Sequence, residues 1–222
     1  MPSPARAAAV PRVAGREEVL VVPRSRALPD GSWHGIRPGG VGRLLGEIAR
    51  SGRFLPRAEV ESQPEWQQII PHLVVVADGA VLAMRRLQAG TERRLRGQVT
   101  IGVGGHINAG DGEPRTAWRS GCQREWREEV VCDRSLVGRP VGLIKDDAGA
   151  VGQVHLGVLI MVDATSSRVE VRERQKLQGQ LTPLADLAVF YLEMETWSQF
   201  VYDALLVGSL DWGCASELEI AL

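Results

Sequence analysis

The stretch GGHINAGDGEPRTAWRSGCQREWREEVVC, residues 104–132, ends with three glutamates that lie within five positions of one another. On a helix, Glu125, Glu128 and Glu129 are separated by three and four positions, so their side chains leave from one face. Like charges this close repel one another, and a bound divalent cation would remove the repulsion. Hard cations such as Mg²⁺ take oxygen ligands, and carboxylates at helical spacing supply several. We therefore predict a helix with a wet, acidic, metal-binding face.

The same helix is expected to have a dry face. Cys122, Trp126 and Val130 recur every four residues, which is the spacing of side chains that pack into a core. Arg124 precedes Glu128 by four residues and is placed to hold the carboxylates. An ordinary surface helix with charge pairs four residues apart would also explain this run.

The turn before the helix favours a functional site. Gly104-Gly105 follows a strand-like run, and the whole stretch resembles a Nudix box, G-x5-E-x7-R-E-U-x-E-E-x-G-U, in which U is an apolar residue. Gly105 matches the first glycine of that pattern. Residues 124–129, REWREE, match R-E-U-x-E-E in full.

The stretch departs from the Nudix pattern in three ways. Asp111 stands where the first glutamate is expected, and twelve residues rather than seven separate it from Arg124. Val131 replaces the glycine after the helix, and Cys132 follows as the apolar residue. The five extra residues would lengthen the loop or the front of the helix. Glu113 is a candidate to substitute for the missing glutamate.

The chain around the box is similar to a bacterial Nudix subgroup that is often labelled phosphoesterase-like, from about Val19 to Leu205. The shared phrases are QIIPHLVV, IGVGGHIN, REWREE, GLIKDD and VGQVHLGV. The resemblance implies an α+β fold in which a mixed β-sheet is sandwiched between helices (α/β/α). It also implies an enzyme, a pyrophosphohydrolase that uses Mg²⁺, or Mn²⁺ in its place. Water would attack phosphorus in the diphosphate linkage of a nucleoside diphosphate derivative or related small molecule.

Carried over by position, the resemblance assigns roles to five residues. Glu125, Glu128 and Glu129 would bind the metal together with the backbone carbonyl of Gly105, and Arg124 would orient the glutamates. Glu128 is the first choice for the general base, and Glu129 is the alternative. The predicted catalytic set is therefore Glu128, Glu129 and Arg124, and no organic cofactor is expected.

Other polar residues have two interpretations each. His106 is either a loop imidazole bonded to backbone or a contact to substrate phosphate, and Asn108 is either a turn residue or a ligand contact. Asp146-Asp147 is typical of a solvated turn, with a further carboxylate source for the metal as the alternative. His155, at the start of an apolar strand, is typical of a satisfied core or rim histidine.

The substrate pocket is expected to come from residues outside the box. Arginines surround the loop after a predicted hairpin, and either a solvated loop or phosphate binding explains them (Arg85, Arg86, Arg93, Arg94 and Arg96). The N-terminal extension offers further candidates, although for each a structural role is the leading interpretation (Trp33, Phe54, Arg57, Trp66 and His72).

Periodicity and turn residues predict the remaining elements. Strands are expected at 18–22, 73–77, 80–84, 98–103, 141–144, 154–162 and 170–172. Helices are expected at 41–51 and 195–206, with a helical turn at 64–68 and a helix that begins at Thr182-Pro183. Residues 1–15 are predicted to be a disordered tail, 16–208 a single domain with an N-terminal extension and the box at 105–132, and 209–222 a C-terminal tail.

Composition limits the classes of partner. The chain has 222 residues, 44% hydrophobic and 24% charged, with a net charge of −1, so no global field favours nucleic acid or an anionic membrane. No apolar run reaches the length of a membrane span, and the start lacks the apolar core of a secretory signal. Cys122, Cys132 and Cys214 lack metal-type spacing and indicate reduced thiols in a cytoplasmic protein. The expected partner is a small-molecule diphosphate; monomer and homodimer remain open.

Two other functions compete with hydrolysis. The altered first glutamate, the five extra residues and Val131 would suit a catalytically silent module that senses a nucleotide or binds a protein. A diphosphate isomerase on the same fold would need a cysteine near Gly104-Gly105, and nothing there supplies one. Because REWREE retains all the carboxylates, hydrolysis is the leading hypothesis.

Overall fold

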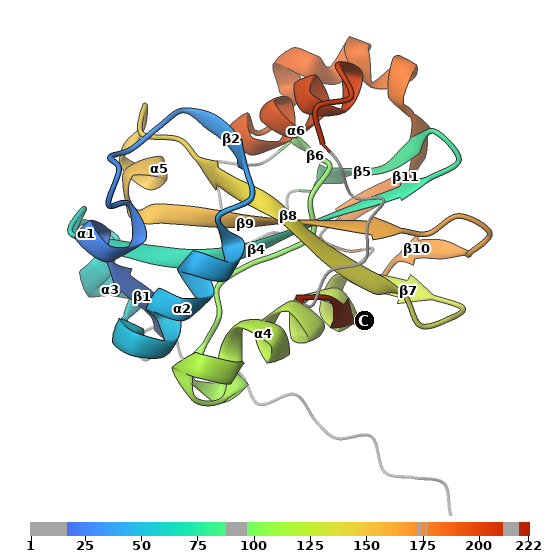
Figure 1. The fold of residues 1–222 in the computed structure, drawn as a ribbon. Coiled ribbons are helices and arrows are strands. Elements are labelled where there is room, and N and C mark those ends of the chain that lie inside the picture. The colour runs from blue at the N-terminus through green and yellow to red at the C-terminus, as the bar shows by residue number, and fades with distance from the viewer. Residues whose placement is uncertain (1–16, 88–96, 173–174, 176, 211–217) are drawn as a thin grey trace, which may run out of the picture.

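A mixed β-sheet forms the centre of the molecule (Figure 1). The computed structural model describes residues 17–87, 97–172, 175, 177–210 and 218–222. In this part of the chain the sheet has ten strands, and its main path is β11 (Leu177–Pro183), β5 (Ala80–Arg86), β4 (Trp66–Ala77), β9 (His155–Asp163), β8 (Val137–Lys145) and β12 (Ile220–Ala221). The strands off this path are β1 (Glu18–Pro23), β2 (Gly35–Pro38), β3 (Arg53–Pro56) and β6 (Val99–Thr100). A separate pair joins β7 (Val130–Cys132) to β10 (Val169–Val171).

Two parallel strands occupy the middle of the sheet. β4 and β9 are paired from Gln68↔His155 to Val76↔Asp163, and β8 lies antiparallel to β9 on its other side. The predicted hairpin between β4 and β5 is confirmed. Its turn residues Asp78 and Gly79 have φ of 50° and 79°, which is the conformation that favours Asp-Gly in a two-residue turn.

Helices cover both faces of the sheet, as Figure 1 shows. α2 (Val41–Ser51) and α4 (Pro114–Glu129) lie on one face; the 3-10 helix η3 (Leu184–Glu193) and α6 (Thr196–Leu206) lie on the other. The shorter helices are α1 (Arg24–Ala27), α3 (Arg57–Val60), η2 (Ala109–Asp111) and α5 (Ala150–Val154). Among the described helices, none combines the length and apolarity needed to cross a membrane.

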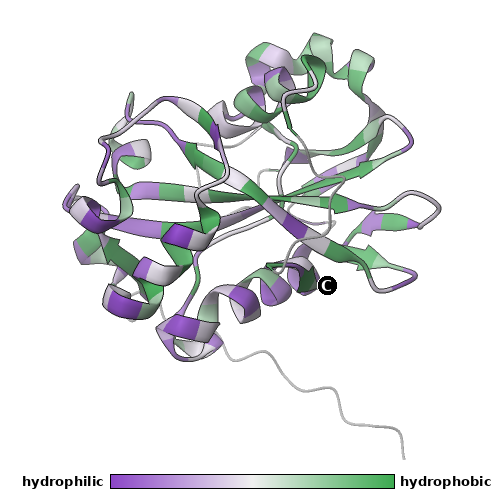
Figure 2. Cartoon of the chain, in the orientation of Figure 1, coloured by the Kyte–Doolittle hydropathy of each residue, from purple (hydrophilic) through white to green (hydrophobic). Residues whose placement is uncertain are grey.

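Successive side chains of β9 belong to two different hydrophobic cores. Val158 and Ile160 join the core that contains Trp126 of α4, whereas Leu159 and Met161 join the core that contains Val201 of α6. Successive side chains of a strand point to opposite faces, so one strand supplies both layers. Figure 2 shows these central strands as largely hydrophobic, with hydrophilic bands on the helices outside them. The predicted α/β/α sandwich is therefore confirmed.

Two predicted helices are wrong. The helical turn expected at 64–68 is replaced by the start of β4 at Trp66. The helix expected from Thr182-Pro183 begins instead at Leu184, because Thr182 and Pro183 pair with Val81 and Ala80 at the end of β11. A proline lacks an N–H and is tolerated at the end of an edge strand as well as at the start of a helix.

The chain ends also bear on the predicted domain limits. The tail predicted for residues 1–15 lies outside the described residues. Within the predicted tail 209–222, Ile220 pairs with Gly138 of β8, and Glu219 forms an ion pair with Arg139 at 2.9 Å. The last described residues therefore extend the sheet beside β8.

The dry face of α4 provides a test of the packing. We expect Trp126→Ala to lower the free energy of unfolding by about 3–5 kcal/mol, since a buried indole is removed and its cavity remains. Trp126 is 5% exposed, whereas Leu192 is 92% exposed. Leu192→Ala is therefore the control, with an expected change within about 0.5 kcal/mol. Urea unfolding measures both, and an unchanged midpoint for Trp126→Ala would contradict the assigned packing.

A buried histidine lies on the opposite face of β4. His72 is 6% exposed, its ring contacts Trp197 edge-on with centroids 5.6 Å apart, and its Nε2 lacks a hydrogen-bond partner in the described part of the chain. A Cβ at Gly102 would lie 2.0 Å from the ring, so only glycine fits there. Burial, with a smaller contribution from the charge of Arg86, lowers the pKa of His72 to about 4.

This pKa predicts a loss of stability in mild acid. Between the unfolded pKa of 6.5 and the folded pKa of about 4, the unfolded chain binds a proton that the folded chain excludes. The contribution is complete above pH 6.5 and is lost as the pH falls toward 4. From pH 7 to pH 5 we expect this group to remove about 2 kcal/mol of unfolding free energy. His72→Phe should lose correspondingly less in urea unfolding at the two pH values; equal losses would exclude His72 as the cause.

Candidate active site

The Gly104-Gly105 turn is pressed between the sheet and the box helix. A Cβ at Gly104 would lie 1.9 Å from the carbonyl oxygen of Pro71 in β4. A Cβ at Gly105 would lie 2.8 Å from both carboxylate oxygens of Glu125 in α4. Glycine is required at both positions because no other residue permits such close approach. The turn therefore brings the backbone of Gly105 directly against the Glu125 carboxylate.

Arg124 connects the parts of this site. Its Nε and Nη2 donate to the two carboxylate oxygens of Asp111 at 2.7 and 2.9 Å, and Nη2 also donates to the carbonyl oxygen of His106 at 2.7 Å. Its Nη1 donates to Oε1 of Glu125. Burial disfavours the charged guanidinium, but the hydrogen bonds and charges of Asp111 and Glu125 outweigh it and raise the pKa of Arg124. The cation is thus held permanently between two carboxylates.

Asp111 occupies the position of the missing first glutamate and holds Arg124 itself. Its Oδ2 also accepts a hydrogen bond from the backbone N–H of Asn108 at 2.8 Å, and Asn108 in turn caps η2, which confirms Asn108 as a turn residue. Only Gly112 and Glu113 lie between Asp111 and the start of α4. The extra residues of the box therefore lengthen the helix and not the loop.

The three glutamates differ in exposure. Glu125 is 7% exposed, enclosed by Gly105 and Arg124, whereas the side chain of Glu128 is 47% exposed and lies 3.6 Å from Nη1 of Arg124. Glu129 is half-buried at the end of the helix. The prediction of a uniformly wet acidic face is wrong for Glu125, because the glycine turn and the arginine cover it. The predicted dry face is confirmed for Cys122 and Trp126, which are buried. Val130 is buried too, but it begins β7 directly after the helix.

The donor set suits a hard divalent cation. Glu125, Glu128, Glu129 and the carbonyl of Gly105 offer only oxygen ligands, as Mg²⁺ and Mn²⁺ prefer. The Glu125 carboxylate fills the space that a Cβ at Gly105 would take, so the backbone of Gly105 and this carboxylate are already adjacent. Over the described residues, no group of three or more His, Cys, Asp or Glu side chains is gathered as a metal site. Metal binding by these four residues stays a prediction.

The Asp146-Asp147 turn was predicted to be a solvated turn, with a further carboxylate source for the metal as the alternative; in the structure both side chains have partners. Asp147 forms ion pairs with Lys145 at 3.0 Å and with Arg24 at 2.5 Å, and Asp146 meets His34 at 3.1 Å. Partial burial would raise the pKa of Asp147, but hydrogen bonds from its neighbours outweigh it and lower that pKa. These partners belong to the N-terminal extension and to β8, so the turn is bound by cations of its own.

Lys145 is a residue that sequence reasoning missed. Its side chain is fully buried, and Nζ donates to the carbonyl oxygens of Gly152, Gln153 and His155 at 2.5, 3.1 and 3.0 Å. Burial lowers the pKa of Lys145, and Asp147 opposes that effect. The available signal was a lysine at the end of an apolar strand immediately before two aspartates.

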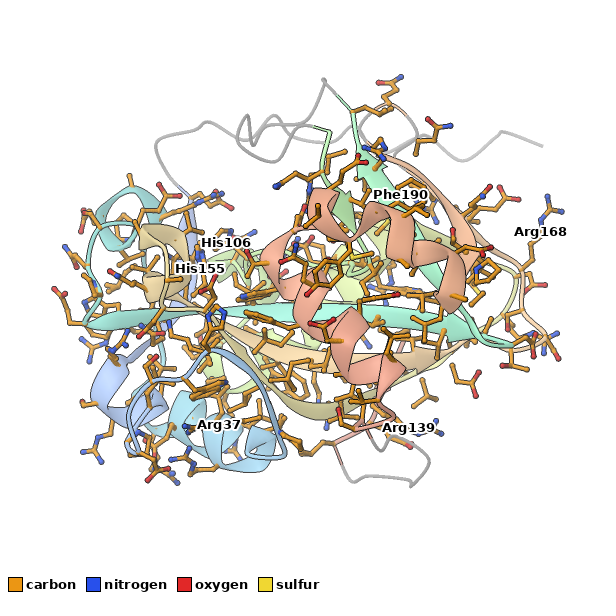
Figure 3. The ribbon with its side chains drawn as sticks, turned by 90° about the horizontal axis from the view of Figure 1, so that it is seen from above. Arg37, His106, Arg139, His155, Arg168 and Phe190 are labelled. Atoms are coloured by element: carbon orange, nitrogen blue, oxygen red, sulfur yellow. The ribbon has the colours of Figure 1, made fainter. Side chains whose placement is uncertain are left out.

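His106 and His155 lie together on the sheet face that α6 covers in part (Figure 3). Nε2 of His106 is 2.9 Å from Oε1 of Gln68 and 3.2 Å from Nε2 of His155. His106 therefore faces side chains, in contrast to the prediction of a backbone-bonded loop residue. His155 is half-buried, which agrees with the rim histidine predicted from the sequence.

The remaining candidates have structural partners. Arg85 and Arg86 pair with Glu193 and Glu195, while Arg93, Arg94 and Arg96 lie outside the described residues. In the N-terminal extension, Trp33 donates to the carbonyl of Gly35 and stacks on Arg37. Trp66 stacks on Arg53, and Phe54 packs on the core. Arg57 forms ion pairs with Glu17 and Glu61. These contacts support the structural interpretation of each residue.

Comparison with known proteins identifies the family. No family model matches the chain. Protein YmaB of Bacillus subtilis (strain 168) is 32% identical over 201 residues, which cover 85% of this chain and 97% of that protein. The crystal structure of Tm1382, a candidate Nudix hydrolase, is 30% identical, covers 86% of this chain and 99% of its own, and superposes with a TM-score of 0.73. The chain belongs to the Nudix hydrolase family. It is accordingly an enzyme of the pyrophosphohydrolase type, and the site around Arg124 is its Nudix box.

The arginine of this Nudix box should be sensitive to a conservative change. Arg124→Lys keeps the charge but cannot bridge Asp111, Glu125 and the His106 carbonyl together. We expect a loss of about 1–3 kcal/mol in unfolding free energy, because buried acceptors lose their donors. Arg115→Lys, at an exposed position of the same helix, is the control and should change little. Equal unfolding midpoints for the two variants in urea would contradict this role of Arg124.

Proposed function

We propose that this Nudix hydrolase is a Mg²⁺-dependent enzyme that cleaves the diphosphate linkage of a nucleoside diphosphate derivative or a related small molecule. Mn²⁺ is the alternative ion. The observation that carries the proposal is the placement of the Glu125 carboxylate between the Gly105 backbone and Arg124. This arrangement holds a carboxylate close to the backbone of Gly105. A helix with a purely structural role would not need a carboxylate there.

Four residues would hold the ion: Gly105 through its carbonyl, and Glu125, Glu128 and Glu129 through their carboxylates. Bound there, a divalent ion neutralises phosphate oxygens and lowers the pKa of a bound water. The protein's part is to keep these groups in place. Arg124 does so for Glu125, since it is itself fixed by two hydrogen bonds that it donates to Asp111.

We assign proton transfer to Glu128. Its side chain is 47% exposed, so water reaches it, and it lies 3.6 Å from the Arg124 guanidinium. An ionised carboxylate at this position accepts a proton from water that attacks phosphorus. Glu129, half-buried and one residue further, is the alternative base.

The features that favour a catalytically silent module have structural explanations. Asp111 takes over the arginine contact of the first glutamate, and the extra residues lengthen α4 ahead of the acidic cluster. Val131 lies in β7, where it pairs with Glu170 of β10 and leaves the helix end in place. These observations support hydrolysis over silent binding.

The proposed partner is a small molecule, with neither nucleic acid nor membrane as a ligand. The net charge of −1 supports this assignment. We also propose that the enzyme works in the cytoplasm, because Cys122 and Cys132 are free thiols. Burial raises the pKa of Cys122, so this thiol is an unreactive part of the core.

Release of phosphate or nucleotide from a panel of nucleoside diphosphate derivatives, with Mg²⁺ and with Mn²⁺, tests the proposal. We expect wild type to turn over at least one compound and Glu128→Gln to lose at least about 10²-fold of that rate, the usual size of an acid–base contribution. The folded state should persist, since removing one charge from an acidic cluster relieves repulsion.

Glu113→Gln, at the exposed N-cap of the same helix, is the matched control and should retain the wild-type rate, because Asp111 and not Glu113 pairs with Arg124. Wild-type turnover that survives Glu128→Gln would exclude Glu128 from the chemistry. Silence of folded wild type across the whole panel, with nucleotide binding that is unaffected by Glu128→Gln, would instead favour the silent module.

A further inference from the structure

Two imidazoles face each other beside the Nudix box. Nε2 of His106 and Nε2 of His155 are 3.2 Å apart, and the ring centroids are separated by 5.3 Å with the planes tilted at 58°. Two nitrogens bound to one zinc-like ion at about 2.0–2.1 Å lie about 2.9–3.4 Å apart for bond angles between octahedral and tetrahedral. The two rings therefore already have the separation of neighbouring ligands on one ion.

The tautomer of His155 leaves a lone pair on Nε2, which points toward His106. Nδ1 of His155 lies 2.7 Å from the carbonyl oxygen of Val151, and a carbonyl only accepts, so Nδ1 carries the proton. The unprotonated Nε2 then faces His106. A histidine that binds a metal usually donates its other ring N–H to a carbonyl or carboxylate in this way. Burial lowers the pKa of His155, which keeps the ring neutral.

A buried amide completes the cluster. Gln68 is 0% exposed, and its Oε1 lies 2.9 Å from Nε2 of His106. Its Nε2 finds no hydrogen-bond partner anywhere in the described residues. A buried unpaired N–H costs about 1–3 kcal/mol, so the orientation of this amide calls for an explanation. This oxygen and the unprotonated Nε2 of His155 are both acceptors, so Nε2 of His106 carries the proton that they share. An ion that displaced this proton, with the His106 ring in its other tautomer, would have the oxygen beside it as a third ligand.

Two of the three side chains come from strands, and the third follows a tightly packed turn. Gln68 and His155 are direct partners in the register of the parallel strands β4 and β9. His106 follows Gly104-Gly105, and that turn is held against the carbonyl of Pro71. Figure 3 shows His106 and His155 side by side at this end of the sheet. A site on such elements needs little rearrangement to bind an ion.

The neighbouring cations are neutralised and do not repel an ion strongly. Arg57 forms ion pairs with Glu17 at 3.2 Å and Glu61 at 2.8 Å. Lys145 forms an ion pair with Asp147 at 3.0 Å. Each of these two positive charges is therefore paired with a carboxylate, and Asp147 is shared with Arg24.

We propose that His106, His155 and Gln68 form a binding site for a divalent transition-metal ion of the Zn²⁺, Co²⁺ or Ni²⁺ class. Imidazole nitrogens select these ions, whereas the oxygen ligands of Gly105 and the box glutamates suit Mg²⁺. Three protein ligands leave a fourth position open, as in zinc sites that receive a water or substrate oxygen. The proposal concerns a second site and does not depend on hydrolysis.

Titration of Zn²⁺ into the full, untagged chain by calorimetry, in saturating Mg²⁺, tests this site. We expect one Zn²⁺ to bind, and His155→Ala and His106→Ala each to weaken it by at least about tenfold, the lower end of what even outer-shell changes cost. His34→Ala is the matched control, because His34 is a 59% exposed histidine that pairs with Asp146. Visible absorption of the Co²⁺ form provides a second readout of imidazole ligation.

Two further variants test whether Zn²⁺ binds instead at the box glutamates or at a thiol. Thermal unfolding checks that each variant is folded. Glu128→Gln and Cys132→Ser should leave Zn²⁺ affinity unchanged if the ion binds at the histidines. The proposal is overturned if wild type binds no Zn²⁺ or if His155→Ala binds it as tightly. It is equally overturned if Glu128→Gln or Cys132→Ser abolishes binding while His155→Ala does not.

Discussion

The guanidinium of Arg124 is the interaction on which the site depends. It is bound on one side by Asp111, on another by Glu125, and through the His106 carbonyl by the turn that precedes the helix. The loop, η2 and α4 would otherwise present several like charges to one another in a poorly solvated region. A paired, hydrogen-bonded charge resolves that conflict, whereas an unpaired one at the same place would be costly. The geometry of the Nudix box is thus set by one cation.

The second constraint is the close packing of two glycines between the sheet and the box helix. Because Gly104 rests on β4 and Gly105 on Glu125, the turn fixes the distance between the central strands and the box helix. The parallel pair β4 and β9 places Gln68 and His155 against His106, the residue that follows this turn. The oxygen donors of the box glutamates and the nitrogen donors of His106 and His155 consequently lie near the same turn. Each set has its own supporting contacts.

Short-range sequence patterns correctly predicted the features that depend on neighbouring residues. The four-residue spacing of Cys122 and Trp126 predicted the dry face of α4, and the closely spaced strands expected at 73–77 and 80–84 predicted the hairpin. The burial of Glu125 was not predictable from spacing, because it arises from Gly105, which lies twenty positions earlier. Likewise, the contact between His106 and His155 joins segments 49 residues apart. The error at Thr182-Pro183 arose because proline suits both a strand end and a helix start, and only pairing with β5 decides between them.

The buried ammonium of Lys145 has a consequence for how the chain holds together. It binds the carbonyls that end α5 and shares Asp147 with Arg24, which comes from the first helix of the extension. A fragment that began at β4 would keep this charge inside the protein while losing one member of its network. The described residues that precede β4, beginning at residue 17, are therefore part of the cooperative unit. A boundary drawn at the start of the central sheet would cut through the interior of the molecule.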